Sequence, residues 1–118
     1  MNIGEWIYKR ALNSPERIFL KEDSHVFSNR DFNERVNRTC RALAGLGIVK
    51  GERVAVLMVN STEFLDIFFA CAKTGAIMVP LNFRLAPPEL LYIIRDCEPK
   101  ALIYSSEFSD KVSEIRSS

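Results

Sequence analysis

Between Arg53 and Ser105 the chain alternates three short β-prone runs with two helical segments, and this order constrains the fold more than any other feature. The runs are RVAVLMV, AIMVP and ALIYS, each a continuous stretch bounded by turn residues, as in strands that are covered on both faces. Strands separated by helices indicate a parallel sheet with right-handed crossovers. The sequence therefore predicts an α/β fold, with a mostly parallel sheet and helices on both of its faces.

The two helical segments have recognisable starts. Asn60 or Ser61 can cap the first, which has Glu63 in its first turn and runs to Gly75. The second is PPELLYIIRDC, where proline in the first turn does no harm because its missing N–H has no helical partner. The first segment is expected to bury one face, formed by Phe64, Ile67, Phe68 and Cys71.

The N-terminal part predicts a short helix and a β-hairpin. A helix starting at Asn2 is expected to end at Asn13-Ser14-Pro15, because its apolar residues recur at helical spacing: Ile3, Trp6, Ile7 and Ala11. RIFLKEDSHVFS then alternates around a polar turn, which predicts a two-stranded hairpin. Its core-facing residues are expected to be Ile18, Leu20 and Phe27.

A longer helix is predicted after the hairpin. Ser28-x-x-Asp31 has the spacing of a capping box, and Gly45 and Gly47 are typical helix-ending residues. The predicted buried face consists of Phe32, Val36, Cys40, Leu43 and Leu46. The polar tail SDKVSEIRSS is expected to fray.

No linker or repeat divides the chain, so residues 1–118 are expected to form one unit. Three parallel strands with an attached hairpin leave at least one open hydrophobic edge. We therefore expect either that the chain is a partial N-terminal domain of a larger protein, or that it self-associates by exchanging a terminal element between copies.

Composition excludes several classes of protein. A net charge of +1 provides no field for attracting nucleic acid, and we expect no nucleic-acid partner. Three widely spaced cysteines, Cys40, Cys71 and Cys97, are expected to be buried reduced thiols rather than disulfides or metal ligands. The N-terminus does not resemble a secretory signal, and the longest apolar run is too interrupted to span a bilayer. A cytoplasmic location is expected.

Residue chemistry alone identifies no catalytic or metal site. The glycines between Gly45 and Gly51 follow a helix and precede a strand, whereas phosphate-binding glycines follow a strand and precede a helix. His25 is the only histidine, lies in the predicted hairpin and has no partner for nucleophilic chemistry. The acidic residues are scattered and form no pair suited to acid–base catalysis.

Two motifs carry a resemblance to a known family. FSNRDFNERVNRTCRALAGLG and CAKTGAIMVPLNFRL resemble the early helix motif and the second motif of the AMP-forming adenylating enzymes. This superfamily includes acyl-CoA synthetases, luciferases and peptide-synthetase adenylation domains. Phe32 stands where Tyr is frequent in the family, and the Pro80-Leu81-Asn82-x-Arg84-Leu85 form is most similar to acyl- and aryl-CoA ligases. The resemblance covers residues 5–106.

The resemblance implies the N-terminal subdomain of the acyl-CoA synthetase fold, within an enzyme several times longer. Full-length members use ATP and Mg²⁺ to convert a carboxylic acid into an acyl-adenylate, and most transfer the acyl group to coenzyme A, releasing AMP. The implied acid is a long- or medium-chain fatty acid or an aryl acid. The family's phosphate loop, Mg²⁺ site, hinge and catalytic Lys lie beyond position 118, so the resemblance implies an inactive scaffold that binds no cofactor and whose partner is the remainder of the enzyme.

Two residues remain as candidate binding residues. The loop after the Pro-Leu-Asn triplet lies near coenzyme A in some family members, so the resemblance implies a position near that cofactor for Asn82 and Arg84. A helix-cap or surface role for Arg84 is the alternative interpretation. Two alternatives stay open at this point. The chain could be a complete, small Rossmann-like binding module without catalysis, or part of an adenylation domain of the peptide-synthetase or luciferase type.

Overall fold

The computed structural model describes residues 3–22 and 24–117. In chain order its elements are α1 (Ile3–Asn13), β1 (Ile18–Glu22), β2 (His25–Ser28), α2 (Asn29–Gly45), β3 (Arg53–Leu57), α3 (Thr62–Thr74), β4 (Ile77–Pro80), α4 (Pro87–Cys97), β5 (Ala101–Tyr104), the 3₁₀ turn η1 (Ser106–Phe108) and α5 (Ser109–Arg116). The predicted β-α-β-α-β order and the N-terminal hairpin are confirmed. The predicted start at Asn2 lies outside the described residues.

The main sheet has three parallel strands in the order β4-β3-β5. Val54 in β3 is in register with Met78 on one side and Ala101 on the other. The central strand is buried from Val54 to Leu57, whereas the outer strands β4 and β5 are only partly covered. The apolar run in β3 is therefore explained by burial on both faces.

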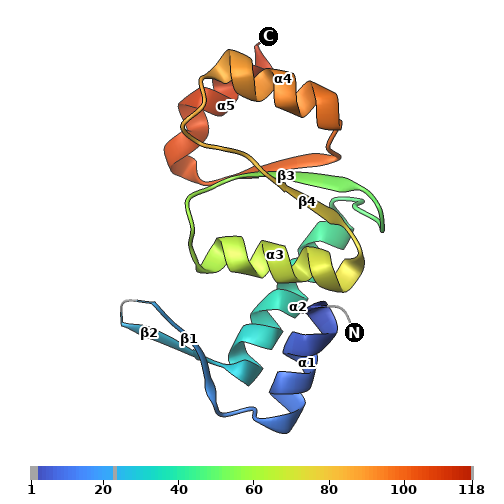
Figure 1. Cartoon of the computed structure of the whole chain (residues 1–118), viewed down its shortest axis with the longest axis vertical. Coiled ribbons are helices and arrows are strands. Elements are labelled where there is room, and N and C mark those ends of the chain that lie inside the picture. Colours follow the sequence, from blue (N-terminus) through green and yellow to red (C-terminus); the bar gives the residue numbers. More distant parts are fainter. Residues whose placement is uncertain (1–2, 23, 118) are drawn as a thin grey trace.

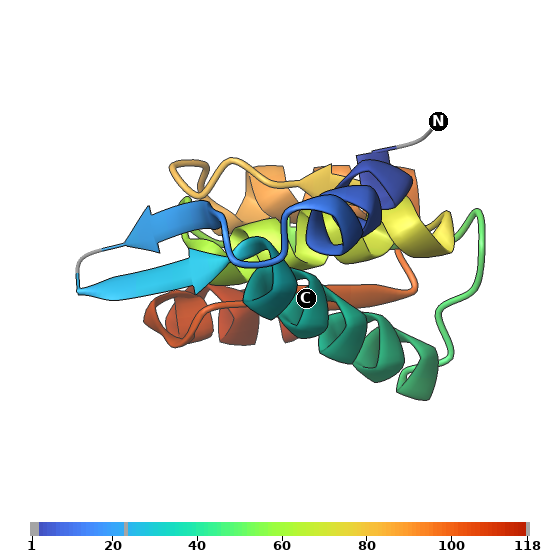
Figure 2. The same ribbon diagram turned by 90° about the horizontal axis from the view of Figure 1, so that it is seen from below.

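The helices form layers on both faces of this sheet (Figure 1). α4 and α5 cover one face, over a core that includes Leu57, Leu90 and Val112. α2 and α3 lie on the other face, and α1 packs against both of them, around a second core that includes Phe32 and Val56. Figure 2 shows the β1–β2 hairpin projecting to one side of these layers.

Residues predicted from the sequence cap the helices α2 and α3. Ser28 Oγ accepts a hydrogen bond from the Asp31 amide at 3.1 Å, which starts α2 as predicted. Of the two candidates for the start of α3, Ser61 is the cap, because its Oγ accepts from the Phe64 amide at 3.2 Å. Gly75 ends α3 with φ at 79°, a left-handed conformation that glycine adopts without strain.

Three predicted core positions are wrong. Ile18 is 60% exposed, because the hairpin register shifts between Ile18 and Leu20, and Phe19 stacks on Phe32 instead. Phe68 is also exposed, and its neighbour Phe69 takes the buried position against α1 and α2. Leu46 lies past the last helical residue of α2 and points to solvent.

The C-terminal segment is a helix rather than a frayed tail. Val112 and Ile115 in α5 are buried in the core beneath α4. Two apolar residues in a polar segment are too few to give a recognisable helical pattern in the sequence, so tertiary packing decides the structure here. The expectation that the tail SDKVSEIRSS frays is therefore wrong.

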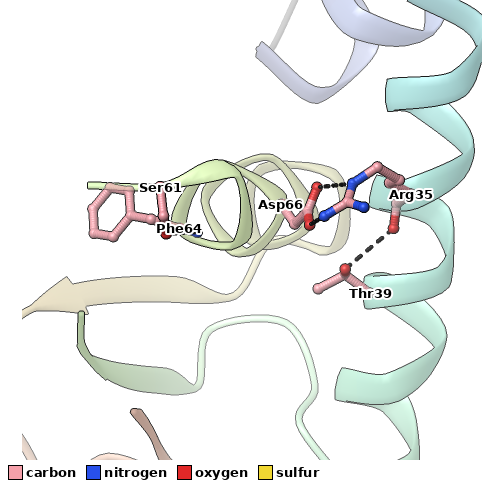
Figure 3. A network of polar contacts seen from close by, with 5 residues as sticks. All are labelled: Arg35, Thr39, Ser61, Phe64 and Asp66. Carbon is pink, nitrogen blue, oxygen red and sulfur yellow. Dashed lines mark hydrogen bonds and ion pairs between the residues drawn. The ribbon is translucent and has the colours of Figure 1, made fainter. Parts of the chain in front are cut away.

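A partly buried ion pair joins α2 to α3 (Figure 3). Asp66 accepts two hydrogen bonds from the guanidinium of Arg35, at 2.6 Å from Nη2 and 3.3 Å from Nε. The same guanidinium lies 4.9 Å from the centre of the Phe27 ring. Arg35 therefore connects both helices with the hairpin.

The molecule is elongated, with principal extents of 48 × 33 × 22 Å. Its radius of gyration is 15.4 Å, whereas a compact domain of this length has one of about 13.5 Å. The difference reflects the projecting hairpin and the three stacked layers.

Candidate functional site

The carboxyl ends of the three parallel strands form the candidate site. The chain leaves β3 toward α3 on one face of the sheet, and leaves β5 toward α5 on the opposite face (Figure 1). In open α/β sheets, ligands bind at the point where neighbouring connections diverge in this way. The loop that follows β4, residues 81–86, lies at the same edge and contains both predicted binding residues.

Asn82 shapes this loop from within. Its side-chain Oδ1 accepts a hydrogen bond from the Arg84 amide at 3.0 Å, and its backbone carbonyl accepts from the Leu85 amide at 3.1 Å. A side chain that bonds its own backbone two residues on is an Asx turn, which fixes the chain direction. Asn82 is exposed, and its side-chain oxygen already accepts one hydrogen bond within the turn, so its amide nitrogen is the group that we consider for contact with a ligand.

Arg84 is exposed on the outside of the same turn. Its guanidinium lies 5.3 Å from the centre of the Phe83 ring, and that ring packs against Phe108 at 5.6 Å between centroids. Within the described part of the chain, Arg84 has no carboxylate partner. The loop therefore presents one unneutralised positive charge, supported by an aromatic ring.

Lys111 in α5 holds the loop in place. Its ammonium group donates to the carbonyl of Phe83 at 2.5 Å and to the carbonyl of Leu85 at 3.0 Å. These carbonyls flank Arg84, so the lysine fixes the backbone on both sides of it. Sequence reasoning missed Lys111. Its two partners lie 28 and 26 positions earlier in the chain, and contacts over such separations leave no local pattern in the sequence.

Two hollows lie beside this edge. One, of about 650 Å³, lies between the hairpin and the start of α3, and is lined by Leu20, Lys21, Asn60, Ser61, Thr62, Phe64 and Leu65. The other, of about 470 Å³, lies next to the loop and is lined by Leu85, Pro88, Glu89, Tyr92 and Ile93. Both linings combine apolar side chains with polar or charged ones: Lys21, Asn60, Ser61 and Thr62 in the first hollow and Glu89 in the second.

The three cysteines are free thiols, Cys71 buried and the other two half-buried. Burial raises the pKa of Cys71 to about 11 and also raises that of Cys40, which favours the unreactive thiol form. His25 is exposed on β2 and stacks on Phe27. Among the described residues, no group of three or more His, Cys, Asp or Glu is placed to hold a metal ion.

None of the helices in the described ranges has the length and apolarity needed to cross a bilayer.

Comparison with known proteins confirms the family resemblance. The family model for AMP-binding enzymes matches residues 7–118. The long-chain-fatty-acid–CoA ligase FadD13 of Mycobacterium tuberculosis is 39% identical over 117 residues, which are 98% of this chain and 23% of the ligase. Feruloyl-CoA synthase of Amycolatopsis sp is 34% identical over 113 residues, again covering 23% of the relative.

The solved structures agree with the predicted fold. The crystal structure of the N-terminal domain of FACL13 from Mycobacterium tuberculosis superposes with a TM-score of 0.95 at 39% identity, over 99% of this chain and 30% of that one. The chain thus spans 23% of the length of the acyl-CoA ligases named above and corresponds to their N-terminal part. From the match over residues 7–118, we conclude that the chain belongs to the AMP-binding enzyme family.

Proposed function

We propose that this chain works as the N-terminal part of a longer, AMP-forming acid–CoA ligase. Such an enzyme joins a carboxylic acid to the α-phosphate of ATP and releases pyrophosphate, and the thiol of coenzyme A then displaces AMP from the acyl-adenylate. The observation that supports this proposal most is the family match, which runs through nearly the whole chain. The proposed acid is a long- or medium-chain fatty acid or an aryl acid, in line with the relatives' names.

In this proposal the 118 residues are a scaffold. Among the described residues, no group of three or more His, Cys, Asp or Glu is placed to hold a metal ion. The loop after β4 presents the polar side chain of Asn82 and the guanidinium of Arg84. ATP, Mg²⁺ and coenzyme A would be bound by the longer protein, and the remainder of that protein would be the main partner of this chain. We also propose a cytoplasmic location for the enzyme.

Arg84 is the residue of this chain that we propose to lie near coenzyme A. Its guanidinium is exposed, lacks a carboxylate partner among the described residues, and is held by the turn that Asn82 and Lys111 shape. A guanidinium is well suited to a phosphate group, with which it can form paired hydrogen bonds. Asn82 would support this contact through its free amide nitrogen.

Pyrophosphate release tests the activity. The longer protein is expected to release pyrophosphate with ATP and at least one acid from a panel of fatty and aryl acids, whereas the 118-residue chain is expected to release none. A reading frame that stops at Ser118, or a longer protein that is inactive with the whole panel, would contradict the proposal.

The role of Arg84 is tested separately in the longer protein. Arg84→Gln is expected to raise the KM for coenzyme A about tenfold, while pyrophosphate release in the absence of coenzyme A stays unchanged. Arg41→Gln removes another exposed charge, from α2, and serves as the matched control. An unchanged KM for coenzyme A in Arg84→Gln would mean that Arg84 does not bind coenzyme A. The proposed ligase activity would not be affected by that result.

The second candidate function is a small binding module that associates with a partner or with a second copy of itself. The observation that favours it is the pair of open sheet edges, because within residues 3–22 and 24–117 β4 and β5 each have only one neighbouring strand. This candidate differs from the first in requiring a stable product of 118 residues.

A further inference from the structure

A positively charged hollow lies at the end of α1, away from the sheet edge. It has a volume of about 290 Å³ and is lined by Trp6, Lys9, Arg10, Asn13, Ser14 and Arg17. Three of these side chains are cationic and none is acidic. Glu16, which lies in the same segment, does not line the hollow and forms an ion pair with Arg30 instead.

The backbone around the hollow is firmly held. The Ser14 carbonyl accepts hydrogen bonds from the Arg17 amide at 3.2 Å and from the side-chain amide of Asn29 at 2.8 Å. The backbone amide of Asn29 in turn donates to the backbone carbonyl of Arg17 at 2.8 Å. Asn29 is fully buried, so the turn that carries Ser14 and Arg17 is anchored to the start of α2.

The cations lining the hollow are not neutralised. The guanidinium of Arg10 lies 5.0 Å from the centre of the Trp6 ring, and its Nε is buried without a hydrogen-bond partner among the described atoms. Neither Lys9 nor Arg17 has a carboxylate partner in the described ranges. Cations often stabilise the C-terminal end of a helix, which accounts for Arg10 in the last turn of α1. That effect does not account for Arg17, which lies four residues past the end of α1.

We propose that this hollow binds a phosphate group. Guanidinium and ammonium groups form charge-assisted hydrogen bonds with phosphate oxygens, and Asn13 and Ser14 add neutral polar groups to the lining. A volume of about 290 Å³ lies at the lower limit for small-molecule sites, so the hollow accommodates a phosphate or diphosphate better than a whole nucleotide. The phosphate can belong to a soluble metabolite or to a lipid headgroup. The proposal does not depend on the acid–CoA ligase activity.

Trp6 provides a direct readout, because it is the only tryptophan of the chain. Titrating the 118-residue chain with inorganic pyrophosphate at constant ionic strength is expected to change Trp6 fluorescence in a saturable way. A parallel titration uses vesicles of phosphatidylglycerol, with phosphatidylcholine vesicles as the neutral reference. Saturation by pyrophosphate identifies a soluble phosphate as the ligand, and a response to phosphatidylglycerol alone identifies a headgroup.

Three variants make the test specific. Arg17→Gln and Lys9→Gln each remove one charge from an exposed lining residue, and each is expected to weaken binding about tenfold. Arg41→Gln removes an exposed charge from α2 and is expected to bind as the unmodified chain does. Thermal unfolding of each variant establishes that the fold is intact.

Two outcomes would overturn the proposal. One is the absence of any fluorescence change with pyrophosphate and with phosphatidylglycerol vesicles. The other is equal weakening by Arg41→Gln and Arg17→Gln, because attraction by overall charge would then explain the binding without a site.

Discussion

The ion pair between Arg35 and Asp66 illustrates how one residue stabilises several elements. Asp66 is 7% exposed, so removal of its partner would leave a carboxylate buried with no opposite charge beside it. Arg35→Gln is therefore expected to lower the free energy of unfolding at pH 7. The loss should be about 2 kcal/mol, smaller than for a fully buried pair, because the arginine side chain is partly solvated. Urea denaturation measures this change. Arg41→Gln, which removes an arginine without a carboxylate partner among the described residues, should leave stability unchanged.

The pH dependence of this effect has a defined sign. Burial raises the pKa of Asp66 above its ordinary value of 3.8, and the Arg35 hydrogen bonds offset part of that rise. Just above pH 3.8 the folded state therefore binds more protons at Asp66 than the unfolded state, so this group's contribution to stability falls as pH rises through that window. Arg35→Gln removes the interactions that lower the pKa of Asp66, so that pKa should rise further. The loss of stability caused by Arg35→Gln should then be smaller at acidic pH, where Asp66 is protonated, than at pH 7. An equal cost at pH 7 and pH 5 would contradict this account.

Gly4 allows α1 to approach α3 closely. A Cβ atom at this position would lie 2.7 Å from Cγ and 2.8 Å from Cα of Lys73. Because part of this clash is with backbone, Gly4→Ala should push the helices apart and destabilise the protein by about 2 kcal/mol.

Gly45→Ala is the matched control for this prediction. Apart from its chain neighbours and the adjacent backbone of α2, no described atom lies within 4 Å of the corresponding Cβ position, so the change should leave stability unchanged or raise it slightly. The melting temperatures of both variants measure the difference. Equal melting temperatures would mean that the close approach at Gly4 is not required.

Helix α5 holds the candidate loop in its observed shape. Lys111→Met should remove both hydrogen bonds to the loop carbonyls while preserving the apolar part of the side chain. The amides of Arg84 and Leu85 are then expected to exchange with solvent roughly tenfold faster, as measured by NMR. Lys100→Met, which removes an exposed lysine elsewhere, should leave these two amides unchanged.

The elements that the sequence predicts well are those with strong local signals. The buried run in β3 and the caps Ser28 and Ser61 depend on neighbouring residues, and each was found at its expected place. The hairpin bulge that exposes Ile18, and the packing that orders α5, depend on distant contacts that no local pattern encodes. The candidate loop was identified by family resemblance. The hydrogen bonds from Lys111 that hold the loop could be found only in the structure.

At the scale of the whole molecule, both outer strands of the sheet have one free edge. Central β3 is paired on both sides, so β4 and β5 each present unpaired backbone groups toward solvent or toward a missing neighbour. Consistent with this position, the residues of β4 and β5 are exposed or only partly buried. An unpaired strand edge is a template for another strand, so the 118-residue chain is expected to self-associate.

Sedimentation velocity over a hundredfold range of concentration tests this expectation, and the average mass should rise with concentration. Ile77→Lys places a charge on an exposed residue of the β4 edge and should shift the association to higher concentration, because an edge lysine opposes strand pairing. Val49→Lys makes the same type of change at an exposed residue outside the sheet and should have no effect. If the unmodified chain stays monomeric throughout, the open edges do not drive association. If Val49→Lys acts as strongly as Ile77→Lys, the contact forms elsewhere on the surface.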